Sequence, residues 1–105
     1  EGKQTRDYVY VKDVVQANVK ALDCNESGFY NVGTGKETDV NTLFRIISSK
    51  IGSFEEKHGP AKPGEQMRSV ISTKKIEKIM GWKLTTDLEE GLTKTIEWVK
   101  HKHNL

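Results

Sequence analysis

The clearest apolar pattern in the chain lies in its middle. Hydrophobic residues recur there at the i, i+3, i+4, i+7 and i+11 spacing of one helix face. Asp39 is placed to cap this helix, and Gly52 is a natural residue to end it because positive φ costs glycine least. We therefore predict a helix over about 40–51, with this apolar stripe: Val40, Leu43, Phe44, Ile47 and Ile51.

Two further helices are predicted from capping-box patterns. Asp13 with Gln16 three residues later favours a helix over about 14–22, whose apolar residues share one stripe. Asp87 with Glu90 favours a last helix that starts after Asp87 and runs through Leu92, Ile96 and Val99.

A short fourth helix is predicted around Ile76, capped by Ser72 or Thr73. Gly81 and Trp82 fit a Schellman end, in which the indole would pack back onto Ile76.

Strands are expected at three places. Residues 6–11 alternate with period two and are rich in aromatic and β-branched side chains, which favours a strand. Residues 29–32 predict a second short strand, and 70–71 a third. Both prolines fall within 53–69, which we predict to be a loop. Two to four short strands with four helices indicate an α/β fold.

Composition narrows the class of protein. A chain of 105 residues forms at most one domain, and its net charge of +2 does not indicate a nucleic-acid or membrane partner. Cys24 is the single cysteine, so no disulfide can form within the chain. We expect a cytoplasmic protein, and the opening at Glu1 resembles the middle of a longer sequence.

One glycine-rich stretch resembles half of a dinucleotide fingerprint. Gly33 and Gly35 come between a predicted strand and a helix, where backbone N–H groups could approach a pyrophosphate. However, Thr38 stands at the third glycine position, and the remaining residues, 36–105, are too few for a dinucleotide fold. We interpret the stretch as a tight strand-to-helix turn, with no cofactor bound by this chain.

The other candidate motifs are isolated. His101 and His103 have no third ligand nearby in sequence, so we predict no metal site and a solvated helix end. Cys24 and His58 do not form a nucleophile–base pair by spacing, and we assign no catalytic residue.

Three cations are of more interest. Arg6 opens a predicted strand beside Tyr8, Lys62 lies in the proline-rich loop, and Arg68 follows. A cation on a strand and another on a loop can clamp a diphosphate, and a tyrosine offers a stacking surface for a base. Scattered cations are more often surface charges, so these residues alone do not decide between the two.

Five ordered blocks of sequence resemble the NAD-dependent nucleotide-sugar epimerases and dehydratases, of the extended short-chain dehydrogenase/reductase type. Together they extend over nearly the whole chain, and they are most like the C-terminal part of UDP-glucose 4-epimerases. The blocks are GKQTRDYVYVKDV (2–14), FYNVGTG (29–35), KPGE (62–65), GWK (81–83) and LEEGLTKTIEW (88–98).

The resemblance implies that this chain corresponds to only part of an enzyme. Members of the family carry a glycine-rich NAD loop and a catalytic Tyr-x-x-x-Lys pair in regions that these blocks do not include. Tyr8 and Lys12 have the catalytic spacing but lie in a different segment, so we do not assign them to catalysis. We expect residues 1–105 to form one C-terminal nucleotide-sugar-binding portion, without the NAD-binding domain of the parent enzyme.

The resemblance also implies site residues. Arg6 matches the arginine that binds the substrate diphosphate. Lys62 stands where most members have a second arginine that binds the diphosphate. A lysine supplies the charge but lacks the planar guanidinium fork that allows bidentate binding. Glu65 stands where an acidic residue, usually Asp, accepts a ribose hydroxyl. Tyr8 and Arg68 are further candidates for substrate contact.

Three functions remain open. In the first, the chain is the substrate-binding part of a nucleotide-sugar epimerase, is inactive alone and grips a UDP- or TDP-sugar. In the second, it serves a 4,6-dehydratase or decarboxylase in the same way. In the third, it is a non-catalytic binding or assembly module. The resemblance implies that 29–32 would be the last strand of a parallel sheet. Self-association through that exposed sheet edge is therefore also expected.

Overall fold

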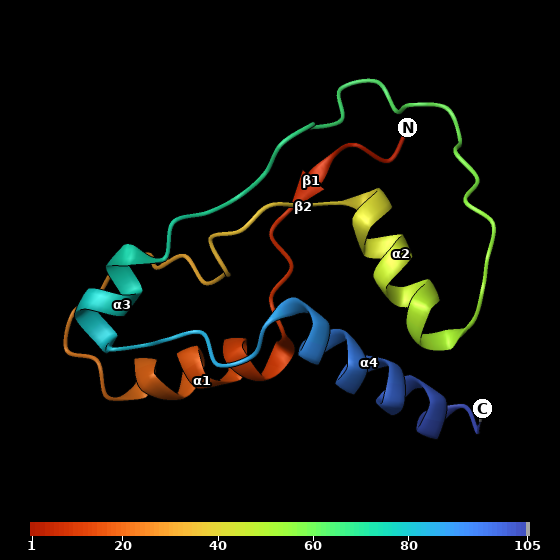
Figure 1. The fold of residues 1–105 in the computed structure, drawn as a ribbon. Coiled ribbons are helices and arrows are strands. Elements are labelled where there is room, and N and C mark those ends of the chain that lie inside the picture. Colours follow the sequence, from red (N-terminus) through yellow and green to blue (C-terminus); the bar gives the residue numbers. More distant parts are fainter. Residues whose placement is uncertain (105) are drawn as a thin grey trace.

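The computed structural model describes residues 1–104, which form four helices and one two-stranded sheet (Figure 1). β1 pairs antiparallel with β2, with Thr5 opposite Asp39 and Arg6 opposite Thr38. The α/β class is confirmed. The elements in chain order are β1 (Thr5–Arg6), α1 (Val11–Leu22), β2 (Thr38–Asp39), α2 (Val40–Ile51), α3 (Lys74–Met80) and α4 (Leu88–Lys102).

The molecule is flat and open. Its radius of gyration is 16.3 Å and its extents are 49 × 37 × 18 Å. A compact domain of this length has a radius of gyration of about 13 Å. In Figure 1 α1 and α4 run along one side, and the long connection from α2 to α3 passes around the opposite side.

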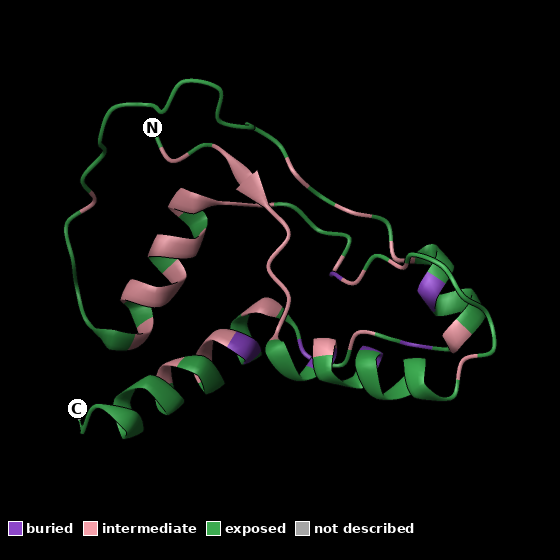
Figure 2. Cartoon of the chain, turned by 180° about the vertical axis from the view of Figure 1, so that it is seen from behind, coloured by how far each residue is buried: buried purple, intermediate pink, exposed green. Residues whose placement is uncertain are grey.

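A small core lies where α1, α3 and the segment after α3 meet (Figure 2). Its buried apolar residues are Ala17, Ile76 and Trp82. The Trp82 indole Nε1 donates to the backbone oxygen of Asp13, at 2.9 Å. The predicted packing of Trp82 with Ile76 is confirmed, since both belong to this cluster. Partly buried residues surround it: Tyr30, Val32, Met80 and Leu84.

The helix ends follow local chemistry. α2 has the bounds that its apolar stripe predicts, and α4 begins directly after Asp87, whose Oδ1 accepts a 2.8 Å hydrogen bond from the N–H of Glu90. Gly81 adopts the left-handed conformation at φ +68°. Its N–H donates to the oxygen of Glu77, which is the single bond of an αL end where the sequence predicts a Schellman end.

The predicted strand over 6–11 is wrong in extent, and so is the predicted cap at Asp13. Only Thr5 and Arg6 pair with another strand, and α1 begins at Val11 with Tyr10 at its N-cap. The Asp13 carboxylate lies inside the first turn and is fully buried. It accepts hydrogen bonds from the Thr85 N–H and hydroxyl and from the Thr86 N–H, so it anchors the segment before α4 instead.

The predicted strands over 29–32 and 70–71 are also wrong, because neither segment joins a ladder among residues 1–104. Residues 29–32 lie against α3 instead: the Lys75 ammonium donates to the Phe29 oxygen at 2.9 Å and lies over the Tyr30 ring. Self-association through a sheet edge at 29–32 stays a prediction, but the strand that would form this edge is not present in the structure of residues 1–104.

Candidate functional site

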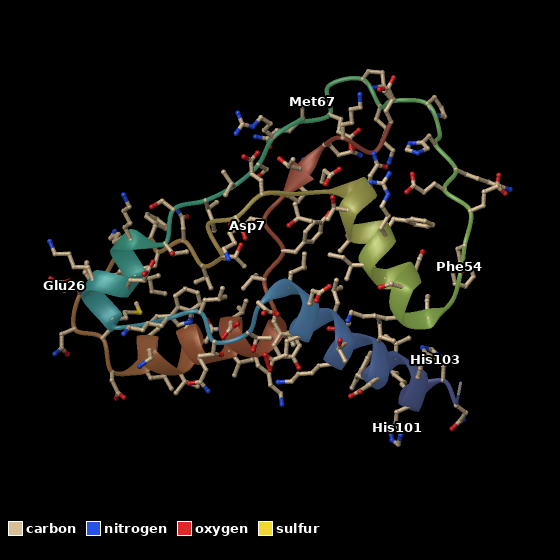
Figure 3. All side chains as sticks on the ribbon, in the orientation of Figure 1. Asp7, Glu26, Phe54, Met67, His101 and His103 are labelled. Carbon is tan, nitrogen blue, oxygen red and sulfur yellow. The ribbon has the colours of Figure 1, made fainter. Side chains whose placement is uncertain are left out.

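The proline-rich connection returns to β1 and runs beside it. The Thr5 N–H donates to the Met67 oxygen at 2.7 Å, and the Ser69 N–H donates to the Thr5 hydroxyl at 3.3 Å. Figure 3 shows Met67 on this connection, above β1. Residues 62–69 are 55 or more positions away from β1 in sequence, and these bonds bring their side chains to one edge of the sheet.

Arg6 is fixed at one side of its guanidinium group. Its Nη1 donates to the backbone oxygens of Thr5 and Gln66, at 2.6 and 2.8 Å. Its Nη2 lies 3.9 Å from a carboxylate oxygen of Glu65. In the part of the chain that the structure describes, Nε and Nη2 form no hydrogen bond, so the edge that binds a phosphate in bidentate fashion is available.

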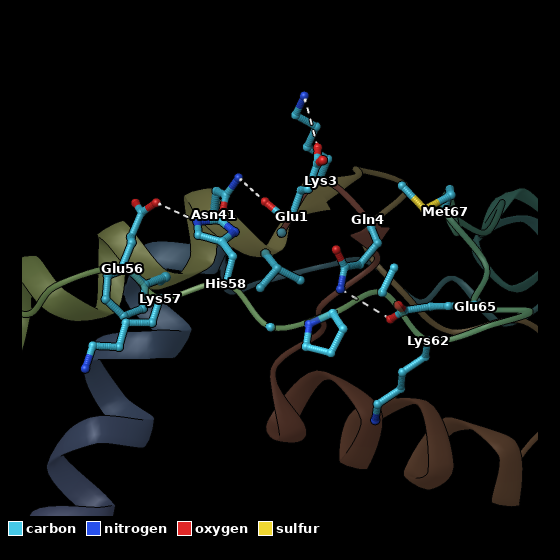
Figure 4. A pocket seen from close by; sticks show the side chains of 16 residues that line it. Glu1, Lys3, Gln4, Asn41, Glu56, Lys57, His58, Lys62, Glu65 and Met67 are labelled. Atoms are coloured by element: carbon cyan, nitrogen blue, oxygen red, sulfur yellow. Dashed lines mark hydrogen bonds and ion pairs between the residues drawn. The ribbon is translucent and has the colours of Figure 1, made fainter.

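A cavity of about 480 Å³ opens beside this site (Figure 4). Lys62 and Glu65 both line it, together with Gln4 at the start of β1. The Glu65 carboxylate accepts a 3.2 Å hydrogen bond from the Gln4 side-chain amide, which fixes its orientation. The structure therefore brings three of the predicted residues, Arg6, Lys62 and Glu65, into one neighbourhood.

Arg68 forms an ion pair with Glu37 and, within residues 1–104, does not contact the residues of this cavity through a hydrogen bond. Its Nε and Nη2 donate to the two carboxylate oxygens of Glu37, at 2.9 and 2.7 Å. These two hydrogen bonds, together with the one that the Thr5 hydroxyl donates to Glu37, lower the pKa of Glu37 to about 2. The same pairing with Glu37 raises the pKa of the Arg68 guanidinium group. Sequence reasoning missed Glu37, because nothing local distinguishes it from other surface acids.

Tyr8 faces a different depression. It lines a groove of about 670 Å³ between the start of α1 and α4, which Tyr10, Leu92 and Trp98 also line. Neither Tyr8 nor Arg68 lines the cavity that holds Lys62 and Glu65. The predicted cluster of cations and tyrosine is thus divided, since Arg68 pairs with Glu37 and Tyr8 lines a groove apart from Lys62 and Glu65.

Asp7 organises the glycine-rich turn. Its carboxylate accepts hydrogen bonds from the Thr34 N–H and hydroxyl, at 2.8 and 2.6 Å, from the Gly35 N–H at 3.0 Å, and from the Ile71 N–H at 3.4 Å. Burial raises the pKa of Asp7, but these bonds outweigh it, and the net pKa lies below the ordinary value. Gly33 is required here, because a Cβ would lie 2.8 Å from Ile71 side-chain atoms and 2.9 Å from the Asp7 carboxylate.

The same contacts test whether this turn suits a dinucleotide. The Thr34 and Gly35 N–H groups, which a pyrophosphate would need, already donate to Asp7. The turn therefore does not fit the NAD loop that its glycine spacing resembles.

Residues 1–104 contain no cluster of three or more histidine, cysteine or acidic side chains that could hold a metal ion. His101 and His103 lie at the exposed end of α4 (Figure 3). Over the same residues, no helix has the length and apolar character needed to cross a membrane.

Comparison with known proteins identifies the family. Residues 1–95 match the family described as GDP-mannose 4,6 dehydratase. The chain is 43% identical to a putative UDP-glucose 4-epimerase of Methanocaldococcus jannaschii and 36% identical to a UDP-glucose 4-epimerase of Mycolicibacterium smegmatis, over 98% and 97% of its length. It spans 33% of each relative.

Solved structures of nucleotide-sugar epimerases support the same family assignment. The UDP-glucose 4-epimerase of Thermotoga maritima with UDP-glucose superposes with a TM-score of 0.93 at 35% identity, over 98% of this chain and 34% of that one. A UDP-N-acetylglucosamine 4-epimerase of Methanobrevibacter ruminantium gives 0.90 at 30% identity, over 97% and 33% of the two chains. The fold described above is that of the C-terminal part of these enzymes.

Proposed function

Because the chain belongs to the GDP-mannose 4,6-dehydratase family of NAD-dependent nucleotide-sugar epimerases and dehydratases, we propose that it is the substrate-binding part of an epimerase. Its task is to grip the nucleoside diphosphate of a UDP- or TDP-sugar. The relatives named above support the epimerase assignment. The chain alone is proposed to be inactive, since we assign no catalytic residue to it.

The half-anchored guanidinium of Arg6 is the observation that carries this proposal. Two backbone oxygens hold Nη1 in place, so the side chain loses little further freedom when a ligand binds. Nε and Nη2 form the planar fork that matches two phosphate oxygens. A surface arginine without such an anchor would be a weak candidate, whereas this one is fixed 3.9 Å from Glu65, which lines the cavity.

Lys62 and Glu65 complete the proposed grip. The Lys62 ammonium adds a second positive charge for the diphosphate, as a point charge without bidentate geometry. Glu65, oriented by Gln4, is proposed to accept a ribose hydroxyl. Arg68 and Tyr8 are proposed at most as outer contacts, because Arg68 pairs with Glu37 and Tyr8 lines another groove.

NAD is proposed to bind outside this chain. The relatives are about three times as long, and the turn at Gly33 and Gly35 gives its N–H groups to Asp7. In the parent enzyme the cofactor would supply transient oxidation of the sugar, and the residues described here would hold the nucleotide meanwhile. The proposed compartment is the cytoplasm.

Two alternatives remain. The chain is also 32% identical to a dTDP-glucose 4,6-dehydratase of Escherichia coli and 33% identical to a UDP-glucuronic acid decarboxylase of Xenopus tropicalis. The same nucleotide grip would serve those reactions. A non-catalytic module that kept the fold is the second alternative, and it would be favoured if the purified chain bound no nucleotide.

The proposal is tested by titrating the purified chain with UDP, TDP and NAD in a calorimeter. We expect a nucleoside diphosphate to bind without NAD. Arg6→Ala should weaken that binding by about 1.5–3 kcal/mol, which is typical of a hydrogen bond to a charged group and amounts to roughly 10- to 150-fold.

Lys20→Ala on α1 removes the same charge from an exposed position and is the matched control. It should bind UDP as the parent chain does. Equal affinities for the parent and Arg6→Ala, with both variants folded by circular dichroism, would overturn the assignment of Arg6.

A further inference from the structure

We propose that Glu37 is a positioning residue for Arg6: its carboxylate ties β1 to the returning connection and so fixes the anchored guanidinium. This inference rests on the proposed function of nucleoside diphosphate binding. It concerns a residue that touches neither the cavity nor any group of Arg6.

Glu37 lies between the two segments that surround Arg6. Its Oε1 accepts a 2.7 Å hydrogen bond from the Thr5 hydroxyl, on the residue before Arg6. Its two carboxylate oxygens accept the bidentate pair from Arg68, two residues after Gln66. One carboxylate therefore links the strand and the connection whose backbone oxygens, on Thr5 and Gln66, hold Nη1 of Arg6.

The link contains a bidentate ion pair, which the other contacts between these segments do not. Two neutral hydrogen bonds also join them, from the Thr5 N–H to Met67 and from the Ser69 N–H to the Thr5 hydroxyl. Two single charge-assisted bonds do so as well, from the Gln4 amide to the Glu65 carboxylate and from Arg6 Nη1 to the Gln66 oxygen. A bidentate arginine–carboxylate pair is shorter and roughly twice as strong as a neutral bond. Its geometry is also directional, so it sets the position of the connection as well as its distance.

The consequence for Arg6 is geometric. The Gln66 oxygen can hold Nη1 only while the connection stays at its present distance from β1. If the connection moves away, the guanidinium keeps its charge but loses the anchor that presents Nε and Nη2 as a fork. Loss of such orientation lowers affinity without removing any ligand contact.

The test is a double-mutant cycle on the whole chain with UDP as the probe. Glu37→Gln keeps an oxygen for the Thr5 hydroxyl and removes the charge that Arg68 requires. We expect it to weaken UDP binding about five- to tenfold in the parent chain and to have no effect in the Arg6→Ala background, since coupled residues are non-additive. Glu90→Gln, which breaks the exposed pair with Lys94 on α4, is the matched control and should not change affinity.

Hydrogen exchange without nucleotide supplies a second readout. Glu37→Gln should speed exchange of the Thr5 and Ser69 N–H groups several-fold, and leave the Gly81 N–H, which is bonded within α3, unchanged. Equal losses of affinity in both backgrounds, or unchanged affinity with faster exchange, would overturn the positioning role. If the parent chain binds no UDP, the proposed function and this role both fail, and the exchange data then decide separately whether Glu37 holds the connection.

Discussion

Three carboxylates connect segments that lie far apart in the sequence. Asp7 accepts from the turn after residue 32 and from Ile71, Asp13 accepts from Thr85 and Thr86, and Glu37 accepts from Thr5 and Arg68. Each one satisfies at least three donors. In a molecule with so few buried apolar residues, these charged hydrogen bonds carry an unusual share of the specificity of the fold.

The lowered pKa values of Asp7 and Glu37 predict acid sensitivity. Because these carboxyls bind protons less readily in the folded chain, they stabilise it above the ordinary carboxyl pKa values, and that stability is lost as the pH falls toward about 2, the pKa of folded Glu37. We expect the unfolding midpoint in urea to fall between about pH 5 and pH 2.

Glu37→Gln and Arg68→Gln should each make that decline shallower, since one removes the titrating group and the other removes its main partner. The measurement is urea denaturation at several pH values. A decline as steep in both variants as in the parent would show that the Glu37 pair does not contribute to the pH dependence.

At the scale of elements, the helices could be predicted and the strands could not. α2 and the start of α4 depend on residues within a few positions of one another, such as Asp87 and the N–H of Glu90. A strand needs a partner, and alternation over 6–11 says nothing about which residues find one. Of these residues only Arg6 does, and α1 already begins at Val11, the last residue of the predicted strand.

The same limit applies to the candidate site. Family resemblance implies a shared site for Arg6, Lys62 and Glu65, and the structure brings these residues into one neighbourhood, while their binding roles stay predictions. Glu37 and Asp7 could not be assigned roles from the sequence, since their partners lie 27 or more positions away and leave no periodic signal. Asp13 was predicted to cap its own helix, whereas tertiary contacts with residues 85 and 86 determine its role.

The docking of α1 onto the segment before α4 depends on Asp13. Asp13→Ala would leave the buried Thr86 N–H and the part-buried Thr85 N–H without their acceptor, so we expect a loss of about 3 kcal/mol in the free energy of unfolding. Asp13→Asn should cost less, because its amide oxygen still accepts one bond. Urea denaturation measures both, with the exposed Asp23→Asn as control; equal stability of all three variants would contradict this role.

At the scale of the whole molecule, one apolar face is left open. Val11, Val15, Val19 and Leu22 follow one stripe of α1, and the last three are 47%, 49% and 85% exposed. Trp98 on α4 is 60% exposed and lines, together with Val11, the groove between the start of α1 and α4. The large radius of gyration and this face have one cause: among residues 1–104 the buried apolar cluster consists of only Ala17, Ile76 and Trp82. Large exposed apolar patches mark interaction surfaces in soluble proteins.

That face predicts which apolar substitutions the chain tolerates. Val15→Glu with Val19→Lys places an acid four residues before a base, the favourable order for a helical ion pair, and removes two exposed valines. We expect the free energy of unfolding to stay within about 0.5 kcal/mol of the parent and concentration-dependent sedimentation to diminish. Ile76→Ala, an apolar truncation in the buried cluster, should instead cost about 2–5 kcal/mol. If the paired α1 substitution destabilised the chain as much as Ile76→Ala, the α1 face would be packed in solution, and the open shape would not be that of the free molecule.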